Sequence, residues 1–210
     1  HAAGAVCGEL ELEDGASVSC GGCAGYCSAE QRVCAATTPI GVELWSAAFV
    51  DGSDHFYGVD ARVRERVLVG DKRTNVIATL LELPIVPNED PIDVNINAVV
   101  AVDIAPDDPG TLYVLTNHRT LWRVPLADPS ARTALLEQKD DIESCNWLDV
   151  VGSYFAGGCF TGVFFGRLDG TGAGSNTDGT FGGALVGERL FANQSFTVNE
   201  VARDGLMTVL

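Results

Sequence analysis

The chain alternates short apolar runs with polar turns, most clearly between residues 97 and 136. Four apolar runs of strand length fall at 98–104, 112–115, 121–124 and 132–136. The stretches between them are rich in Pro, Asp, Asn and Gly, residues whose backbone preferences favour tight turns. Runs of this length with closely spaced turns and no helical periodicity predict antiparallel β-strands. This stretch therefore predicts a four-stranded sheet.

Weaker copies of this pattern recur along the chain. Asn97, Asn146 and Asn199 each stand before an apolar run, a turn at Asp or Gly, and a second run. The spacing is roughly 50 residues, and four strands per repeat at such a period are the signature of a β-propeller. We therefore predict an all-β fold that is a β-propeller or part of one. A β-sandwich is the alternative, since it uses similar strands without a period.

Other segments fill in this repeat pattern. Strands are expected at 40–50, 55–59, 63–69 and 76–83, forming a poorly matched first repeat that lacks the Asn. In the repeat that begins at Asn146, we expect a strand at 162–168, a Gly-rich loop at 169–179 and a closing strand at 181–186. The repeat that begins at Asn199 reaches only its second strand. The pattern thus contains about three and a half repeats, fewer than the four blades of the smallest propellers, and looks incomplete at the C-terminus.

The tryptophan and arginine residues of these predicted strands also have expected locations. Trp45, Trp122 and Trp147 fall in strand patterns and are expected in the core. Arg62, Arg64 and Arg66 alternate with other residues, which predicts one solvated strand face, with an anion site as the alternative.

Cysteine is concentrated near the N-terminus. Five of the seven cysteines lie there: Cys7, Cys20, Cys23, Cys27 and Cys34. This segment is too poor in large apolar residues to hold a core, so disulfides would supply its stability. A zinc site is the weaker alternative, because it needs a second Cys pair or a nearby His. We predict a disulfide-stapled segment at 1–38 and a β-domain at 39–210.

The remaining two cysteines lie in the β-domain. Cys145 and Cys159 flank a predicted hairpin, so we expect a disulfide across it. An odd total leaves one thiol unpaired, linked to another chain, or paired with a residue outside this sequence. Disulfides of this density indicate an oxidising compartment, which predicts a secreted, periplasmic or cell-surface protein.

Composition narrows the function classes. The chain has 210 residues, 46% of them apolar, and a net charge of −16. Such acidity disfavours nucleic acid and anionic membrane surfaces as direct partners. The sequence contains no apolar run long enough to cross a membrane.

The recurring Asn residues suggest one candidate metal site. If each begins the innermost strand of a blade, their amide oxygens would converge near the central axis, where Asp149 and Glu200 would add negative charge. Such oxygens are the ligands that calcium prefers. The alternative interpretation is that each Asn caps the preceding turn.

At these residues the sequence loosely resembles the secreted bacterial propellers related to gluconolactonases. The resemblance covers about residues 97–210 and implies axial Asn, Asp and Glu residues on a divalent metal that activates water or a lactone carbonyl. The first repeat departs from that pattern because it lacks the Asn.

Two function hypotheses follow. The first is a non-catalytic extracellular binding or structural module in a protein assembly, whose partners are other subunits or further chain that completes the β-domain. The second is a calcium-dependent propeller hydrolase of lactonase or esterase type, with Asn97, Asn146 and Asn199 on the metal. No catalytic residue can be named from the sequence, and no cofactor other than calcium is suggested.

Overall fold

A computed structural model describes residues 42–50, 52–85, 98–117, 120–137, 145–159, 162–171, 182–187, 189–194 and 197–201, together with short strands elsewhere. The chain divides into two compact units, residues 1–41 and 42–210. In the first unit the described residues form two pairs of antiparallel strands. One pair is β1 (Glu9–Glu11) with β2 (Ser17–Ser19), and the other is β3 (Tyr26–Cys27) with β4 (Cys34–Ala35).

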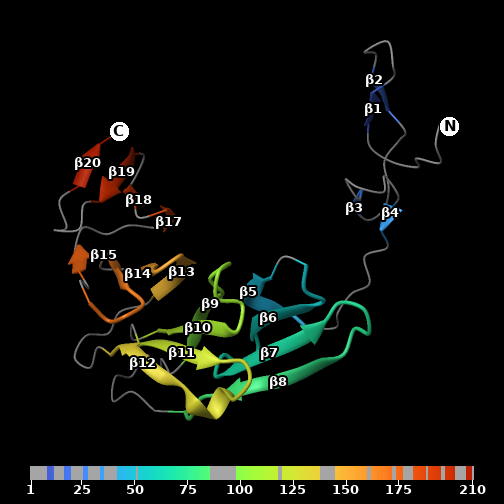
Figure 1. Cartoon of the computed structure of the whole chain (residues 1–210), viewed down its shortest axis with the longest axis horizontal. Coiled ribbons are helices and arrows are strands. Elements are labelled where there is room, and N and C mark those ends of the chain that lie inside the picture. The colour runs from blue at the N-terminus through green and yellow to red at the C-terminus, as the bar shows by residue number, and fades with distance from the viewer. Residues whose placement is uncertain are drawn as a thin grey trace. The chain divides into compact units, whose positions relative to one another are not determined.

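The described residues of the second unit form four sheets, each made of four antiparallel strands in chain order (Figure 1). Sheet 1 comprises β5 (Leu44–Phe49), β6 (His55–Asp60), β7 (Arg66–Asp71) and β8 (Ile77–Glu82). Sheet 2 comprises β9 (Val99–Asp103), β10 (Thr111–Thr116), β11 (Leu121–Pro125) and β12 (Thr133–Leu136). Sheet 3 comprises β13 (Cys145–Val151), β14 (Tyr154–Cys159), β15 (Gly162–Arg167) and β16 (Gly174–Asn176). Sheet 4 comprises β17 (Gly182–Val186), β18 (Arg189–Gln194), β19 (Thr197–Val201) and β20 (Met207–Val209).

Consecutive sheets pack face to face through three apolar clusters. Val59 and Val67 of sheet 1 pack with Val114 of sheet 2. The opposite face of sheet 2 uses Leu115 to pack against sheet 3, and sheet 3 in turn packs against sheet 4. Sheet 2 is thus covered on both faces, which explains why β10 is buried along its whole length and reads as a continuous apolar run. Burial of apolar surface between sheets is the main favourable contribution to folding.

Glycines opposite aromatic rings allow the sheets to pack closely. A Cβ atom added to Gly157 would lie 2.2 Å from the ring of Phe164, its cross-strand partner. A Cβ atom on Gly158 would lie 1.9 Å from Trp147, and Gly183 of sheet 4 borders the same indole ring. These aromatic side chains therefore occupy space that any other residue at the glycine positions would fill.

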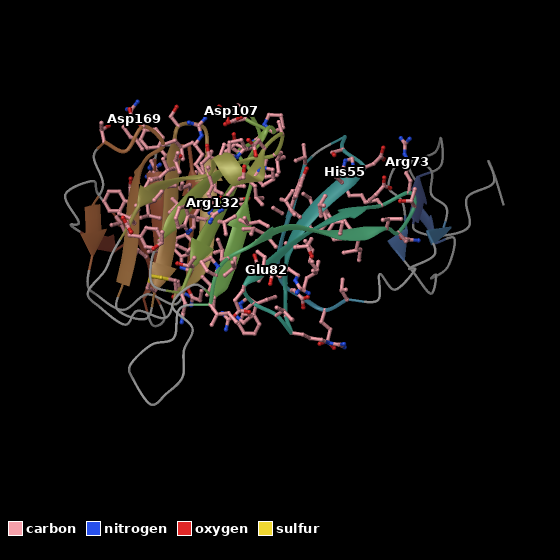
Figure 2. The ribbon with its side chains drawn as sticks, turned by 90° about the horizontal axis from the view of Figure 1, so that it is seen from below. His55, Arg73, Glu82, Asp107, Arg132 and Asp169 are labelled. Carbon is pink, nitrogen blue, oxygen red and sulfur yellow. A yellow bond between two sulfur atoms is a disulfide. The ribbon has the colours of Figure 1, made fainter. Side chains whose placement is uncertain are left out.

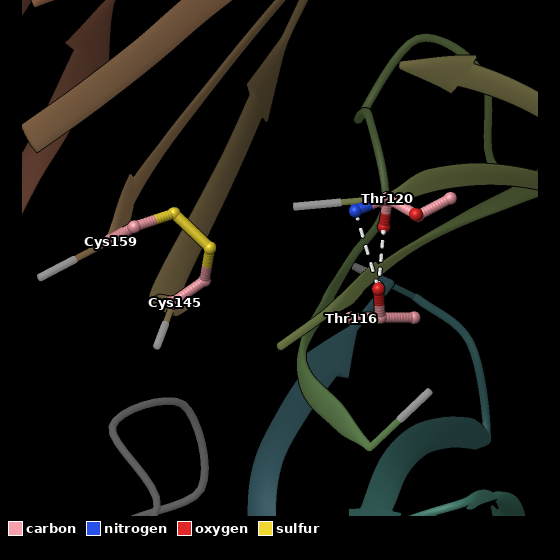
Figure 3. Close-up of a disulfide and its surroundings, with 4 residues drawn as sticks. All are labelled: Thr116, Thr120, Cys145 and Cys159. Atoms are coloured by element: carbon pink, nitrogen blue, oxygen red, sulfur yellow. Dashed lines mark hydrogen bonds between the residues drawn. A yellow bond between two sulfur atoms is a disulfide. The ribbon is translucent and has the colours of Figure 1, made fainter. Parts of the chain in front are cut away.

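A disulfide joins the first two strands of sheet 3. Cys145 and Cys159 are cross-strand partners at the end of the hairpin remote from its turn, and both are buried (Figure 3). The bond across this hairpin is therefore confirmed. In the N-terminal unit Cys27 and Cys34 are also opposite each other in register, whereas Cys7, Cys20 and Cys23 lie outside the described residues.

The four strands expected between 98 and 136 are confirmed as sheet 2. The division of the later chain is corrected. Residues 182–186 begin sheet 4 rather than close sheet 3, and the segment expected as a Gly-rich loop supplies the fourth strand of sheet 3, β16. Glycine-rich composition hid β16, since glycine is depleted in β-structure. β17 was expected as a strand, and only its assignment to sheet 3 was wrong. The described residues of the second unit thus form four four-stranded sheets, not three and a half repeats.

The expected arginine face is also corrected. Only Arg66 lies in a strand, because Arg62 and Arg64 fall in the turn that connects β6 to β7. No helix among the described residues is long and apolar enough to cross a membrane.

Candidate functional site

The first strands of the four sheets are linked by a series of side-chain hydrogen bonds. Ser46 Oγ of β5 accepts a hydrogen bond from the backbone N–H of Val102 in β9, at 3.3 Å. Asp103 Oδ2 of β9 accepts one from the N–H of Val150 in β13, at 2.7 Å. Asp149 Oδ2 of β13 accepts one from the N–H of Leu185 in β17, at 2.6 Å. Sheets 1, 2 and 3 thus each supply one side-chain oxygen to the first strand of the following sheet.

These bonds solve a general problem of edge strands. A first strand pairs with only one neighbour in its own sheet, so its other edge carries backbone N–H groups that need acceptors. Carboxylate acceptors make stronger hydrogen bonds than neutral ones. The carboxylates at Asp103 and Asp149 therefore have a structural role, which sequence analysis recognised for neither residue.

Asp103 is the most electrostatically perturbed of these groups. Its Oδ1 accepts a second hydrogen bond from its neighbour Ile104 N–H, at 2.8 Å. Burial raises the pKa of the Asp103 carboxyl from its ordinary value to about 6. The two backbone hydrogen bonds lower this pKa, and the negative charge of Asp149 raises it slightly further. Both protonation states of Asp103 are thus accessible in mildly acidic solution.

The structure places the three predicted Asn ligands at positions that are not equivalent. Asn97 lies outside the described residues. Asn146 is the second residue of β13, a first strand, and its side chain is exposed. Asn199 lies in β19, the third strand of sheet 4, rather than at the start of a first strand. The expected register, with one Asn at each innermost strand, is therefore wrong for Asn199.

The two acidic residues predicted near the metal have identified hydrogen-bond partners. Asp149 accepts the backbone bond from Leu185 described above. Glu200 receives two hydrogen bonds from Arg189 of the neighbouring strand, at 2.8 and 2.6 Å, and this pairing lowers the pKa of Glu200. Within the described part of the chain, no group of three or more His, Cys, Asp or Glu side chains is placed to hold a metal ion. Calcium binding through the three Asn residues stays a prediction.

A second candidate site lies on the face of sheet 1 that points away from sheet 2. Trp45 and Phe49 of β5 are 57% and 63% exposed there, which corrects the expectation that Trp45 is a core residue. The Arg64 guanidinium lies 4.6 Å from the Trp45 ring centre, and the Lys72 ammonium lies 5.5 Å from that of Phe49. Burial lowers the pKa of Arg64. The other two tryptophans, Trp122 and Trp147, are partly buried against the inter-sheet clusters, as expected.

Ion pairs surround this face. Arg73 contacts Asp54 at 2.8 Å near the end of the sheet where β6 begins, and Arg66 contacts Glu82 at 3.5 Å. Figure 2 shows His55 and Arg73 at one end of sheet 1 and Glu82 at the other. The exposed aromatic residues with cations above them form the aromatic face, which we define as Trp45, Phe49, Arg64 and Lys72. Its combination of flat apolar rings and positive charge suits contact with another protein.

Sequence comparison gives no family for this chain. No family model matches it. No curated protein matches it either.

Comparison with solved structures shows the fold. The chain is similar to structures titled "Crystal structure of Nidogen/Laminin Complex" (TM-score 0.57, 11% identity) and "Crystal Structure of Mitotic Checkpoint Complex" (TM-score 0.56, 13% identity). It is also similar to "YCF48 bound to D1 peptide" (TM-score 0.54, 11% identity). The matches cover 77%, 81% and 80% of this chain but only 60%, 51% and 54% of those chains, respectively. The residues 42–210 therefore have the β-propeller architecture, with sheets 1 to 4 as four consecutive blades, and span little more than half the length of the propeller chains that they match.

Proposed function

We propose that this protein is a non-catalytic binding or structural module of an extracellular protein assembly. The observation that carries the proposal is the aromatic face. Exposed apolar patches often mark surfaces that a partner covers, and Trp45 and Phe49 are each more than half exposed. Trp and Arg are also the residues that most often dominate the energy of protein interfaces.

The disulfide supports the extracellular location. Cys145–Cys159 is buried inside the packing between sheets 2 and 3, so it belongs to the folded core. Disulfides of this kind persist in oxidising compartments and are rare in the cytosol. The acidic composition, with a net charge of −16, favours protein partners over nucleic acid.

The binding proposal is tested by capture followed by reconstitution. The full chain serves as bait for extracellular proteins of its source, and a captured protein is then purified and titrated against the bait. The double variant Trp45→Ser/Phe49→Ser should lose at least about tenfold in affinity, since two interface anchors are removed. Val76→Ser is the matched control, because Val76 is 62% exposed but lies outside the aromatic face. Equal affinity of the double variant would refute the proposal.

The hydrolase alternative makes a different prediction. Calcium in a one-to-one ratio with the purified protein, whose removal by a chelator lowers the melting temperature, would favour the hydrolase. Turnover of lactone or ester substrates that depends on the same calcium would establish it. Neither result is expected if Asp149 and Glu200 serve only the hydrogen bonds observed for them.

A further inference from the structure

The second pair of strands in the N-terminal unit places two cysteines opposite each other. β3 and β4 run antiparallel, and their register pairs Tyr26 with Ala35 and Cys27 with Cys34. Residues directly opposite each other in an antiparallel pair have Cα atoms about 4.5 or 5.5 Å apart. Both separations fall within the range of about 4.4–6.8 Å that disulfides span. The backbone register of this pair therefore suits a disulfide.

Sheet 3 shows the same relation between two cysteines that are bonded. Cys145 and Cys159 are direct cross-strand partners in β13 and β14, and a disulfide joins them. Cys27 and Cys34 are direct cross-strand partners in β3 and β4, with six residues between them in the sequence. The backbone relation that carries a disulfide in sheet 3 thus recurs in the N-terminal unit.

The β3–β4 pair has little else to hold it together. Each strand contains only two residues, and an isolated two-stranded pair is at best marginally stable in water. The segment around it is poor in large apolar residues, so burial contributes little to its stability. Short segments of this kind in secreted proteins are commonly held by disulfides.

We infer that Cys27 and Cys34 form a disulfide that joins β3 to β4. The bond forms by exchange with an external disulfide of the oxidised glutathione type. The Cys27 thiolate attacks one sulfur of that disulfide and releases one external thiolate, and the Cys34 thiolate then attacks the Cys27 sulfur and releases the other. The two cysteines lose two electrons, and their protons pass to the two released thiolates.

This inference goes beyond the proposed function and does not depend on it, because it uses the backbone register of the chain itself. It also narrows the position of the odd cysteine. The bonds Cys27–Cys34 and Cys145–Cys159 use four of the seven cysteines, which leaves Cys7, Cys20 and Cys23. Because three is an odd number, at least one of these three carries a free thiol or is bonded to another molecule.

Peptide mapping of the full chain tests the pairing. The protein is purified without reductant, denatured with a chelator present, and alkylated, so that every free or metal-bound thiol is blocked before digestion. Chymotrypsin cleaves after Tyr26 and trypsin after Arg32, and these cuts separate Cys27 from both Cys23 and Cys34 along the chain. We expect mass spectrometry to find the Cys27 and Cys34 peptides joined before reduction and separate after it.

A set of variants gives a second readout, the number of thiols that alkylation labels. Cys27→Ser and Cys34→Ser should each add one labelled thiol, because each leaves the other cysteine without its partner. The double variant Cys27→Ser/Cys34→Ser should show the same number as the wild type. The matched control is Cys145→Ser, which should add the thiol of Cys159, whose disulfide the structure contains.

Two results would overturn the inference. One is a peptide of Cys27 or Cys34 joined to a peptide of any cysteine other than its proposed partner. The other is alkylation of both Cys27 and Cys34 in the unreduced protein, which is the result expected if they bind a metal instead. The map is read on the wild-type chain, so it decides the pairing even where a variant does not fold.

Discussion

Single residues determine how the first strands of this propeller are joined. Asp103 shows that a carboxylate can be both a structural acceptor and a titrating group, because it bonds Val150 across the sheet boundary and is largely buried. Asp149 was expected near the axis as a metal ligand, since a carboxylate beside a strand gives no sign of which backbone N–H it will meet. Asp103 was missed for the same reason. The aromatic face was missed because apolar residues in a strand are expected in the core.

The raised pKa of Asp103 predicts an unusual pH dependence. The folded state holds the Asp103 proton up to about pH 6, whereas the unfolded chain releases it near 3.8. The folded state therefore binds more protons in this window, and the contribution of Asp103 to the free energy of unfolding falls as pH rises from about 4 to 6. Asp103→Asn removes this loss. The free energy of unfolding of the variant, relative to that of the wild type, should therefore rise by about 1–2 kcal/mol between pH 4 and pH 7, after allowance for screening by water.

Urea unfolding at several pH values measures this difference. The control is Asp107→Asn, since Asp107 is exposed in the turn after β9 (Figure 2). A constant difference between Asp103→Asn and the wild type across this pH range would show that Asp103 does not titrate there.

Gly157 gives a second prediction at this scale. Gly157→Ala places a methyl group against the Phe164 ring, which must move within a packed interface, so we expect a loss of about 1–3 kcal/mol in the free energy of unfolding. Gly182→Ala should be nearly neutral, because a Cβ atom there has no heavy atom within 4 Å. Thermal unfolding of both variants tests this prediction. Equal melting temperatures of Gly157→Ala and Gly182→Ala would argue against the close packing at Phe164.

At the scale of elements, valine-rich strands with Pro, Asp and Gly turns were predicted well, and sheet 2 follows its sequence pattern closely. The prediction failed where strands are rich in glycine. β16 was expected as part of a loop, because its Gly weakens the local preference for a strand. β17 was expected as a strand but assigned to sheet 3, because its pairing with β18 cannot be read from its own residues. The Asn repeat was also misleading, because Asn199 lies in a third strand, which has a different role from the first strand that holds Asn146.

The sheet 3 hairpin depends on its disulfide. The bond closes a loop with a sequence separation of 14 residues, and in the chain-entropy model a loop of this size is worth about 3 kcal/mol. The double variant Cys145→Ala/Cys159→Ala should therefore lose about 2–4 kcal/mol in the free energy of unfolding of the β-domain. Its urea midpoint, followed by the fluorescence of the partly buried Trp147, should no longer respond to reductant, whereas the wild-type midpoint should fall. Equal wild-type midpoints with and without reductant would contradict this role.

At the scale of the whole molecule, the sheets are coupled in sequence, each to the next. Removing one acceptor should therefore loosen the following sheet and leave distant ones unchanged. In Asp149→Ala, the Leu185 amide loses a charged acceptor, a change typically worth about 1.5–3 kcal/mol. We expect faster hydrogen exchange in sheet 4, measured by mass spectrometry, with sheet 1 as the internal reference. Uniform acceleration over all four sheets would instead indicate a single cooperative unit.

The observed acceptor series has a direction. In all three bonds between first strands, the oxygen comes from the earlier strand and the N–H from the later one. During synthesis on the ribosome, the sheet that has already emerged thus contains the acceptor oxygen for the first strand of the sheet that follows. Because of this direction, the sheets can be added one after another, and each new first strand finds its hydrogen-bond acceptor already present in the preceding sheet.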